Sequence, residues 1–177
     1  MSAEHASPIG TRESRAAEWE ALVRELTELD VFCRAFGIEL VLAESERVVL
    51  RTPGKTELCR QSTGQWVGET LEVLASLAAG FLPTSPGSEP GTFVAPYGAT
   101  VRTIYHLRPS SSASVEAEAR WVRRGRTQAV IEATVRDAEG KELVRTLSQH
   151  VAIPEPLAFS LADLRQAHEP IAREPNQ

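Results

Sequence analysis

Two glutamates stand in a segment that is otherwise almost apolar, TGQWVGETLEVLASLAAG at residues 63–80. At about 100° per residue, a helix over this segment places Glu69, Glu72 and Ser76 in one narrow stripe, which Gln65 begins one turn earlier. A carboxylate that faces an interior loses solvation, which raises its pKa and suits it to act as a general base or a nucleophile near neutral pH. The alternative is that the stripe is the one solvated edge of a core helix, where glutamate near the N-terminus favours the helix.

The rest of this helix is apolar or small, so we expect a central helix over residues 65–82 that is surrounded by protein. The glycine spacing of TGQWVG is also found in dinucleotide-binding loops. Such loops have a third glycine and join the strand and helix of a parallel βαβ unit, and this sequence lacks both features. We therefore assign no dinucleotide site.

The neighbouring segments must position this helix, and their patterns predict an antiparallel sheet with a few helices. Apolar residues recur at helical spacing from Arg15 to just before Gly37, and two short alternating runs at residues 37–54 predict a β-hairpin around the polar turn ESE. PTSPGSEPG at residues 83–91 predicts a loop, and a short helix outside the sheet is predicted over residues 157–170.

The second half of the chain is rich in alternating segments, which predict strands at residues 98–109, 114–124, 127–137 and 141–153. The tight connections RRGR and DAEGK predict that these strands follow one another as a meander of antiparallel neighbours. Helix, hairpin, helix, loop and meander together predict an α+β fold with an antiparallel sheet.

Length, charge and cysteine usage limit the class of protein. The 177 residues are about one domain's length, and we divide them into a polar tail at 1–14, a domain at 15–157, and a C-terminal helix and tail at 158–177. A formal net charge of -5 argues against a nucleic-acid surface, because phosphate binding needs an excess of Lys and Arg.

Cys33 and Cys59 are the only cysteines, and no His cluster has metal-ligand spacing, so we predict neither a disulfide nor a metal site. Without a signal peptide or a membrane-spanning stretch in the sequence, we expect a cytoplasmic protein that binds no membrane.

In this order, the segments resemble the hotdog-fold acyl-CoA thioesterases of the phenylacetate-pathway and hydroxybenzoyl-CoA types, from about Leu29 to Ile153. DVFCRAFGIELVLAESERVVLRTPG resembles the family's first helix end and hairpin, YHLRP its strand motif, and EARWVRRGRTQAVIEATVRDAEGKELVR its final hairpin. The resemblance implies that residues 15–157 form a hotdog fold, in which an antiparallel β-sheet wraps around a central α-helix. It also implies a homodimer or homotetramer, in which dimers form by joining sheets edge to edge, and an open sheet edge favours such pairing.

The family's central helix begins H-G-G-x-x-x-x-L-A-[D/E], where the glycine amide polarises the thioester carbonyl and the acid activates water or attacks the carbonyl. Laid on this sequence, the first glycine falls on Gly68 and the acid on Ser76, and Gln61 matches an upstream Asn or Gln that holds the water or the carbonyl. A serine without a base cannot replace a carboxylate. We therefore rank Glu72 first, Glu69 second and Ser76 third as the group that performs the acid's role, and a site that binds without hydrolysis stays open.

The function that the resemblance implies is hydrolysis of an acyl thioester of coenzyme A or an acyl-carrier protein, with coenzyme A as part of the substrate. A non-hydrolytic acyl-CoA-binding or accessory protein, and a hotdog dehydratase or cyclase, are the alternatives. Arg123, Arg124 and Arg126 lie in one tight turn, where the family often holds the phosphates of coenzyme A, and an ordinary charged hairpin tip is the other interpretation. His106 and His150 lie on predicted strands, and we assign neither a role.

Overall fold

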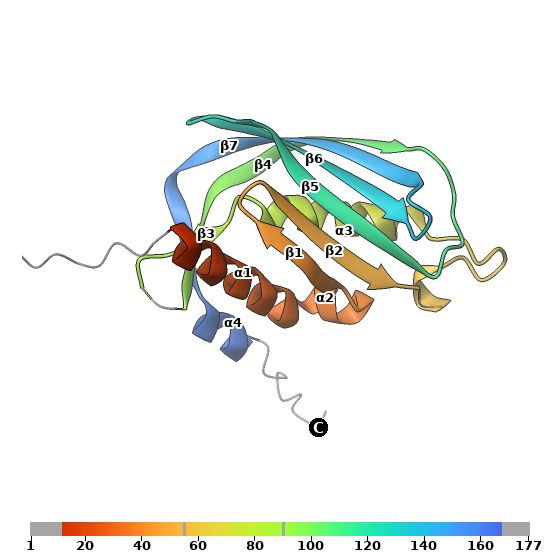
Figure 1. The fold of residues 1–177 in the computed structure, drawn as a ribbon, viewed down its shortest axis with the longest axis horizontal. Coiled ribbons are helices and arrows are strands. Elements are labelled where there is room, and N and C mark those ends of the chain that lie inside the picture. The colour runs from red at the N-terminus through yellow and green to blue at the C-terminus, as the bar shows by residue number, and fades with distance from the viewer. Residues whose placement is uncertain (1–11, 55, 90, 168–177) are drawn as a thin grey trace, which may run out of the picture.

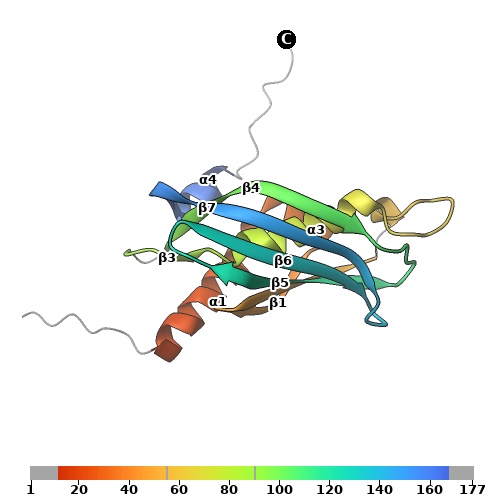
Figure 2. The same ribbon diagram turned by 90° about the horizontal axis from the view of Figure 1, so that it is seen from above.

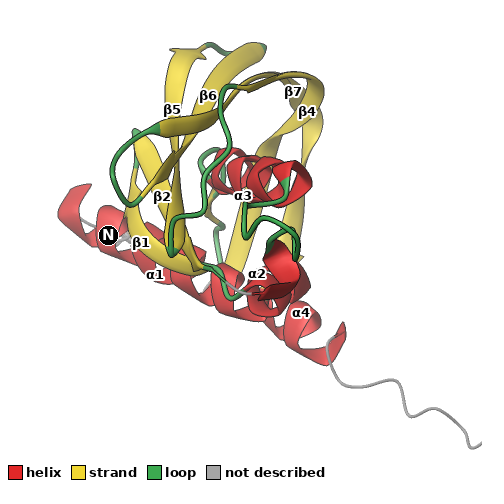
Figure 3. Ribbon diagram, turned by 90° about the vertical axis from the view of Figure 1, so that its right-hand side faces the viewer, coloured by secondary structure: helices red, strands yellow, loops and turns green. Residues whose placement is uncertain are grey.

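The computed structural model describes residues 12–54, 56–89 and 91–167. They form one seven-stranded antiparallel sheet, which curls around a central helix, α3, at Gly68–Phe81, together with shorter helices and loops (Figures 1 and 3). Along the sheet the strands lie in the order β1-β2-β5-β6-β7-β4-β3. Their bounds are Glu39–Glu44 for β1, Arg47–Pro53 for β2, Ser85–Pro86 for β3, Thr92–His106 for β4, Ser114–Arg124 for β5, Gln128–Asp137 for β6 and Glu142–Ser160 for β7. The predicted α+β hotdog architecture is confirmed.

The core lies between α3 and the concave face of the sheet. Inward positions on the central strands are small or β-branched and buried, as the alternation along β5 and β6 predicts. On α3, Leu71 and Leu74 pack into this face, while Ala75, Ala78 and Ala79 let the helix approach the sheet closely. Side chains from both layers bury one another, and this packing fixes α3 relative to β4.

Three further helices lie together at the open side of the curled sheet: α1 at Arg12–Leu29, α2 at Val31–Phe36 and α4 at Leu161–Ala167 (Figure 3). The single helix predicted up to Gly37 is wrong, because Asp30 ends α1 and caps α2. Its side chain accepts a hydrogen bond from the Cys33 amide at 2.8 Å, which is typical of a helix start. Gly37 then ends α2 in the left-handed conformation, at φ 66°.

The predicted meander is only partly correct. β5, β6 and β7 are consecutive neighbours, but β4 pairs with β7, so that β7 lies between β6 and β4 (Figure 2). β5 instead pairs with β2 of the hairpin. No short turn joins β4 to β5. The sequence between them therefore gave no indication that the two strands lie apart in the sheet.

Two strands also extend beyond their predicted bounds. β4 begins at Thr92 instead of Gly98, and the segment predicted as a loop at 83–91 contains the two-residue strand β3. β7 runs to Ser160, and the helix predicted from Leu157 begins only at Leu161. Phe159 stacks on Phe93 of β4 with ring centroids 5.0 Å apart, so pairing with β4 keeps this segment in the sheet. The predicted tails fall largely at 1–11 and 168–177, outside the described residues, and the division of the chain stays a prediction.

Candidate functional site

The first of the ranked carboxylates, Glu72, forms a hydrogen-bonded pair with a histidine. His106 Nε2 lies 2.8 Å from Glu72 Oε1, and the two side chains are 51% and 33% exposed. Glu72 stands on the side of α3 that faces β4, while His106 is the last residue of β4. A sheet strand and the central helix therefore bring together a carboxylate and an imidazole, the two groups most often used for proton transfer in proteins.

Gly68 lies directly beside this pair at the start of α3. A Cβ added at Gly68 would lie 3.0 Å from His106 Cε1 and 3.3 Å from His106 Nδ1, so any larger residue there would make the imidazole shift. The preceding residue, Val67, has no side-chain acceptor to cap the helix. The Thr70 and Leu71 amides donate to the Val67 carbonyl, whereas the Gly68 amide lies ahead of this ladder. Such an amide at a helix start suits the binding of a developing oxyanion.

Ser76, in the position of the family's acid, has both sides of its hydroxyl occupied. Its Oγ donates to the Glu72 carbonyl at 2.7 Å and accepts a hydrogen bond from the Arg102 guanidinium. The structure places no proton acceptor in a position to activate this hydroxyl among the contacts of the described residues. Ser76 is thus a hydrogen-bonding partner of Arg102 in this arrangement.

The basic partners come from one face of β4. Arg102, Ile104 and His106 are two residues apart along the strand and point to the same side, toward α3, where Ile104 packs against the core. His106 and Arg102 were not among the predicted site residues. Their spacing of four on a strand is a signal for a shared face, but the sequence does not show that this face covers α3.

The remaining helix-region candidates do not join the pair. Glu69 is exposed at the start of α3, and Gln61 is exposed in the turn that precedes it. Within the described ranges no hydrogen bond links Gln61 to Glu72 or His106. The predicted helix start at Gln65 is wrong, because Trp66 bridges to Cys59 and its indole donates to the Ser112 carbonyl at 2.9 Å. This pairing keeps the chain extended up to Val67, where ψ is 131°.

The arginine turn is arranged around aromatic side chains. The Arg124 guanidinium lies over Trp121, 5.1 Å from the ring centroid, and Tyr97 Oη donates to the Gly125 carbonyl at 2.7 Å. Arg123 and Arg124 are adjacent on β5 and point to opposite faces of the sheet. Arg126, like Arg123, is exposed. The three arginines do not converge on one side of the strand, and phosphate binding by them stays a prediction.

A buried histidine lies on the concave face behind Arg102. His150 is 3% exposed, and its Nε2 lies 2.9 Å from Ser148 Oγ. Burial, together with the positive charge of Arg102, lowers the pKa of His150 below its ordinary value. His150 is therefore neutral at physiological pH.

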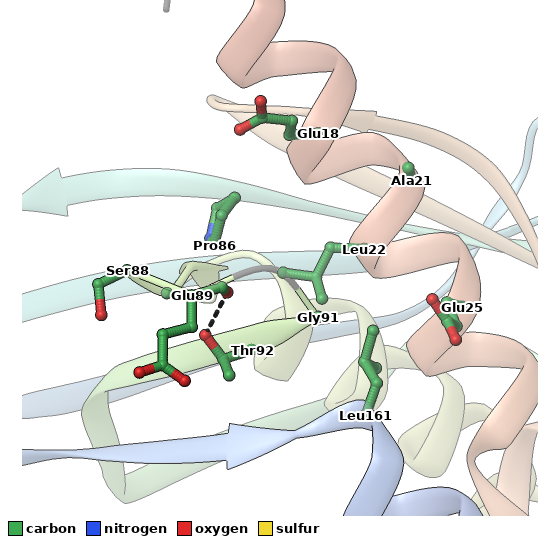
Figure 4. A pocket seen from close by; sticks show the side chains of 11 residues that line it. Glu18, Ala21, Leu22, Glu25, Pro86, Ser88, Glu89, Gly91, Thr92 and Leu161 are labelled. Carbon is green, nitrogen blue, oxygen red and sulfur yellow. Dashed lines mark hydrogen bonds between the residues drawn. The ribbon is translucent and has the colours of Figure 1, made fainter. Parts of the chain in front are cut away.

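A cavity of about 520 Å³ lies away from Glu72 and His106, between α1, the β3–β4 connection and the start of α4 (Figure 4). Leu22, Pro86 and Leu161 form part of its lining, together with the carboxylates of Glu18, Glu25 and Glu89. These carboxylates disfavour an anionic ligand such as an acyl-CoA. We therefore do not place the thioester site in this cavity.

The described part of the chain has neither a metal-ligand cluster nor a membrane-spanning helix. No group of three or more His, Cys, Asp or Glu side chains there is arranged to hold a metal ion. None of the helices found there is long and apolar enough to cross a membrane.

Solved structures with this fold include thioesterases. A PaaI protein of Escherichia coli, from the phenylacetic acid degradation operon, superposes with a TM-score of 0.67 at 18% identity, over 78% of this chain and 96% of that one. A thioesterase family protein from Silicibacter pomeroyi gives 0.60 at 18% identity, over 75% and 96% of the two chains. A thioesterase from Haemophilus influenzae gives 0.54 at 20% identity, over 77% and 89%. At such identities these likenesses show the fold alone.

At the level of sequence, the family profile described as "Thioesterase superfamily" matches residues 71–144, a segment that contains both Glu72 and His106. No curated protein sequence matches the chain. Fold and profile agree on the segment that runs from the central helix into the start of β7. The chain therefore has the hotdog fold, and its residues 71–144 match the thioesterase superfamily profile.

Proposed function

We propose that the protein hydrolyses an acyl thioester, with coenzyme A or a carrier protein as the thiol part. The observation that carries this proposal is the hydrogen bond of 2.8 Å between Glu72 and His106, formed beside the Gly68 amide at the start of α3. A proton acceptor and an oxyanion-binding amide are the two parts that thioester hydrolysis by water needs. In this proposal Glu72 acts through His106, and the two residues together take the role that the family gives to the residue at the Ser76 position.

In the proposed reaction, the thioester carbonyl oxygen accepts a hydrogen bond from the Gly68 amide. The Nε2–H of His106 donates to Glu72, which orients the ring and leaves Nδ1, on the Gly68 side, to accept a proton from water. The water oxygen attacks the carbonyl carbon and forms a tetrahedral intermediate. The C–S bond then breaks, and the departing thiolate takes the proton back from the imidazole, which yields a carboxylic acid and a free thiol.

A second copy of the chain would complete this site. β3 pairs only with Phe93 and Val94, so beyond them β4 has no strand on its outer side among the described residues. An open edge of this length favours pairing with another strand. We propose that two copies join along β4, which places Glu72 and His106 at the boundary between the copies. The cytoplasmic location is likewise a proposal, and it rests on Cys33 and Cys59 both being free thiols.

Release of thiol from a series of aromatic and aliphatic acyl-CoAs tests the proposed reaction. We expect Glu72→Gln to lower kcat/KM by about 100- to 10,000-fold, the usual effect of losing a general acid–base group. Glu69→Gln is the matched control on the same helix, and its kcat/KM should stay within about threefold of wild type because Glu69 is exposed and away from His106. Equal kcat/KM values in wild type and Glu72→Gln would refute the proposed mechanism. If no acyl-CoA is hydrolysed and acyl-CoA nonetheless raises the Tm, the non-hydrolytic binding function replaces it.

A further inference from the structure

Arg102 is held on the inner face of β4 without an acidic partner. Its guanidinium donates to Ser76 Oγ, and no carboxylate of a described residue lies within ion-pair distance of it. On the outer face of the sheet, by comparison, Arg136 and Arg145 both bond to Glu142. A guanidinium has five N–H donors in a fixed fork, and one bond to a hydroxyl leaves most of them available.

This guanidinium lies at Ser76, one turn of α3 beyond Glu72, the residue proposed to orient His106. Ser76, its partner, donates to the backbone carbonyl of Glu72 at 2.7 Å, and one helical turn separates the two residues by about 5.4 Å along the axis. The sheet surface next to Arg102 is polar. Ser148 of β7 pairs directly with Arg102 across the β4–β7 ladder, and His150 lies two residues further on the same face of β7. The positive charge of Arg102 acts on this polar region, because it contributes to the lowered pKa of the buried His150.

We infer that Arg102 binds a carboxylate on the acyl group of the substrate, so that the protein prefers acyl thioesters whose acyl chain ends in an acid. This inference rests on the proposed function, which places the reacting carbonyl at the Gly68 amide. Gly68 and Ser76 are eight residues apart, about 12 Å along the axis of α3, a span that an acyl chain of about six carbons with a terminal carboxylate covers between its two hydrogen bonds. The phosphates of coenzyme A lie on the other side of the carbonyl, at the far end of the pantetheine arm. A chain with a net charge of -5 repels anions, so an acidic acyl group needs a local cation of this kind.

The test compares adipyl-CoA with hexanoyl-CoA, two substrates of equal chain length that differ in the terminal carboxylate. We expect wild type to prefer adipyl-CoA, and Arg102→Met to lower the ratio of the two kcat/KM values by about 10- to 100-fold, the effect of losing a charge-assisted hydrogen bond. Arg24→Met removes the same charge from the exposed face of α1 and should leave the ratio unchanged. A wild-type preference for hexanoyl-CoA, or an unchanged ratio in Arg102→Met, would overturn the inference.

Two further arms separate the remaining explanations. Adipyl-pantetheine has no phosphates, so the Arg102→Met effect should persist with it, and loss of the effect would assign Arg102 to coenzyme A instead. If wild type hydrolyses no thioester, the proposed function fails, and binding then tests the inference by itself. In that case a non-hydrolysable adipyl-CoA ether should raise the Tm more than the hexanoyl ether, and the difference should disappear in Arg102→Met. Equal Tm shifts in wild type would refute the carboxylate site.

Discussion

At the level of single residues, Gly68 is constrained by the imidazole of His106, which lies close to the position where a side chain would begin. In Gly68→Ala the new Cβ would lie 3.0 Å from His106 Cε1, so the ring must move. We expect kcat/KM in the thiol-release assay to fall by about 100-fold, the effect of misplacing a reacting group by about 1 Å. Gly80→Ala on the same helix is the control, because nothing lies within 4 Å of its added Cβ. That variant should keep its activity, and alanine should stabilise the helix by about 0.5–1 kcal/mol. Equal activity in the two variants would contradict the close approach of His106 to the helix start.

The pKa of His150 provides a second prediction at this scale. Because burial and the Arg102 charge lower the pKa of the folded state, the unfolded chain takes up a proton at lower pH that the folded chain does not. The free energy of unfolding should therefore decrease as the pH falls below about 6.5, the ordinary imidazole value. Urea unfolding at pH 7 and pH 5.5 should show a smaller decrease in His150→Gln than in wild type. An NMR titration should also find a higher His150 pKa in Arg102→Met than in wild type. An unchanged pKa would show that the charge of Arg102 does not act on His150.

Sequence patterns could find part of this site but not all of it. The stripe on the central helix identified Glu72 and Ser76, because helical periodicity depends only on local geometry. The partners of these residues come from β4, and a period of two shows which strand residues share a face without showing what that face covers. His106 and Arg102 were therefore invisible as partners until the sheet had been placed against α3. Glu69 stood in the same predicted stripe, yet it is exposed, and among the described residues no hydrogen bond joins it to a side chain of β4.

At the level of elements, the β6–β7 turn depends on one carboxylate. Asp137 accepts hydrogen bonds from the Lys141 amide at 2.9 Å, the Glu139 amide at 3.1 Å and the Ser110 hydroxyl at 3.1 Å. Burial raises the pKa of Asp137, but these bonds and the nearby Lys141 charge outweigh burial and hold the pKa below its ordinary value. The turn thereby ties the loop after β4 to the start of β7.

We expect Asp137→Asn to lower the free energy of unfolding by about 1–2 kcal/mol at pH 7. A lowered carboxylate pKa contributes stability above the unfolded value of about 3.9, and this stability is lost as the pH falls through the folded pKa. Urea unfolding should therefore show the full difference at pH 7 and a smaller one at pH 3. Glu139→Gln, in the same turn with an exposed side chain, should unfold like wild type at both values. A difference that does not depend on pH would mean that the charge of Asp137 is unimportant.

The elements themselves were largely predictable, because alternation on β5 and β6 and the apolar circumference of α3 are strong local signals. The errors lie where tertiary contacts decide. Leu157 to Ser160 could continue a helical pattern, but pairing with Thr92 to Ala95 keeps them in β7. Likewise, a capping Asp30 interrupts a helical apolar pattern that continues across it.

At the level of the whole molecule, the open outer side of β4 predicts a homodimer. Val101 and Tyr105, at 54% and 53% exposure, lie along this strand and would be partly covered by a second copy. Sedimentation velocity should show a dimer at micromolar concentration, and hydrogen exchange should show protected amides along residues 97–106 on both edges of the strand. Specific activity should fall when the protein is diluted below the dissociation constant, since the site lies at the proposed boundary. A monomer that retains full activity would refute the joined-sheet arrangement.

The order of strands in the sheet also dictates how a growing chain can fold. β2 can pair with β5 only after α3 and β4 have been synthesised. β4 can pair with β7 only near the end of synthesis, because β7 is nearly the last element of the chain. Pairing between such distant segments is slow, because closing a long loop costs conformational entropy before the strand contacts that offset this cost can form. On the ribosome, β4 therefore emerges with one edge unpaired and the other paired only at Phe93 and Val94, and its apolar side chains stay exposed to chaperones and neighbouring chains until β7 is synthesised. The strand that we expect to join two finished copies is thus also the one through which unfinished copies would first aggregate.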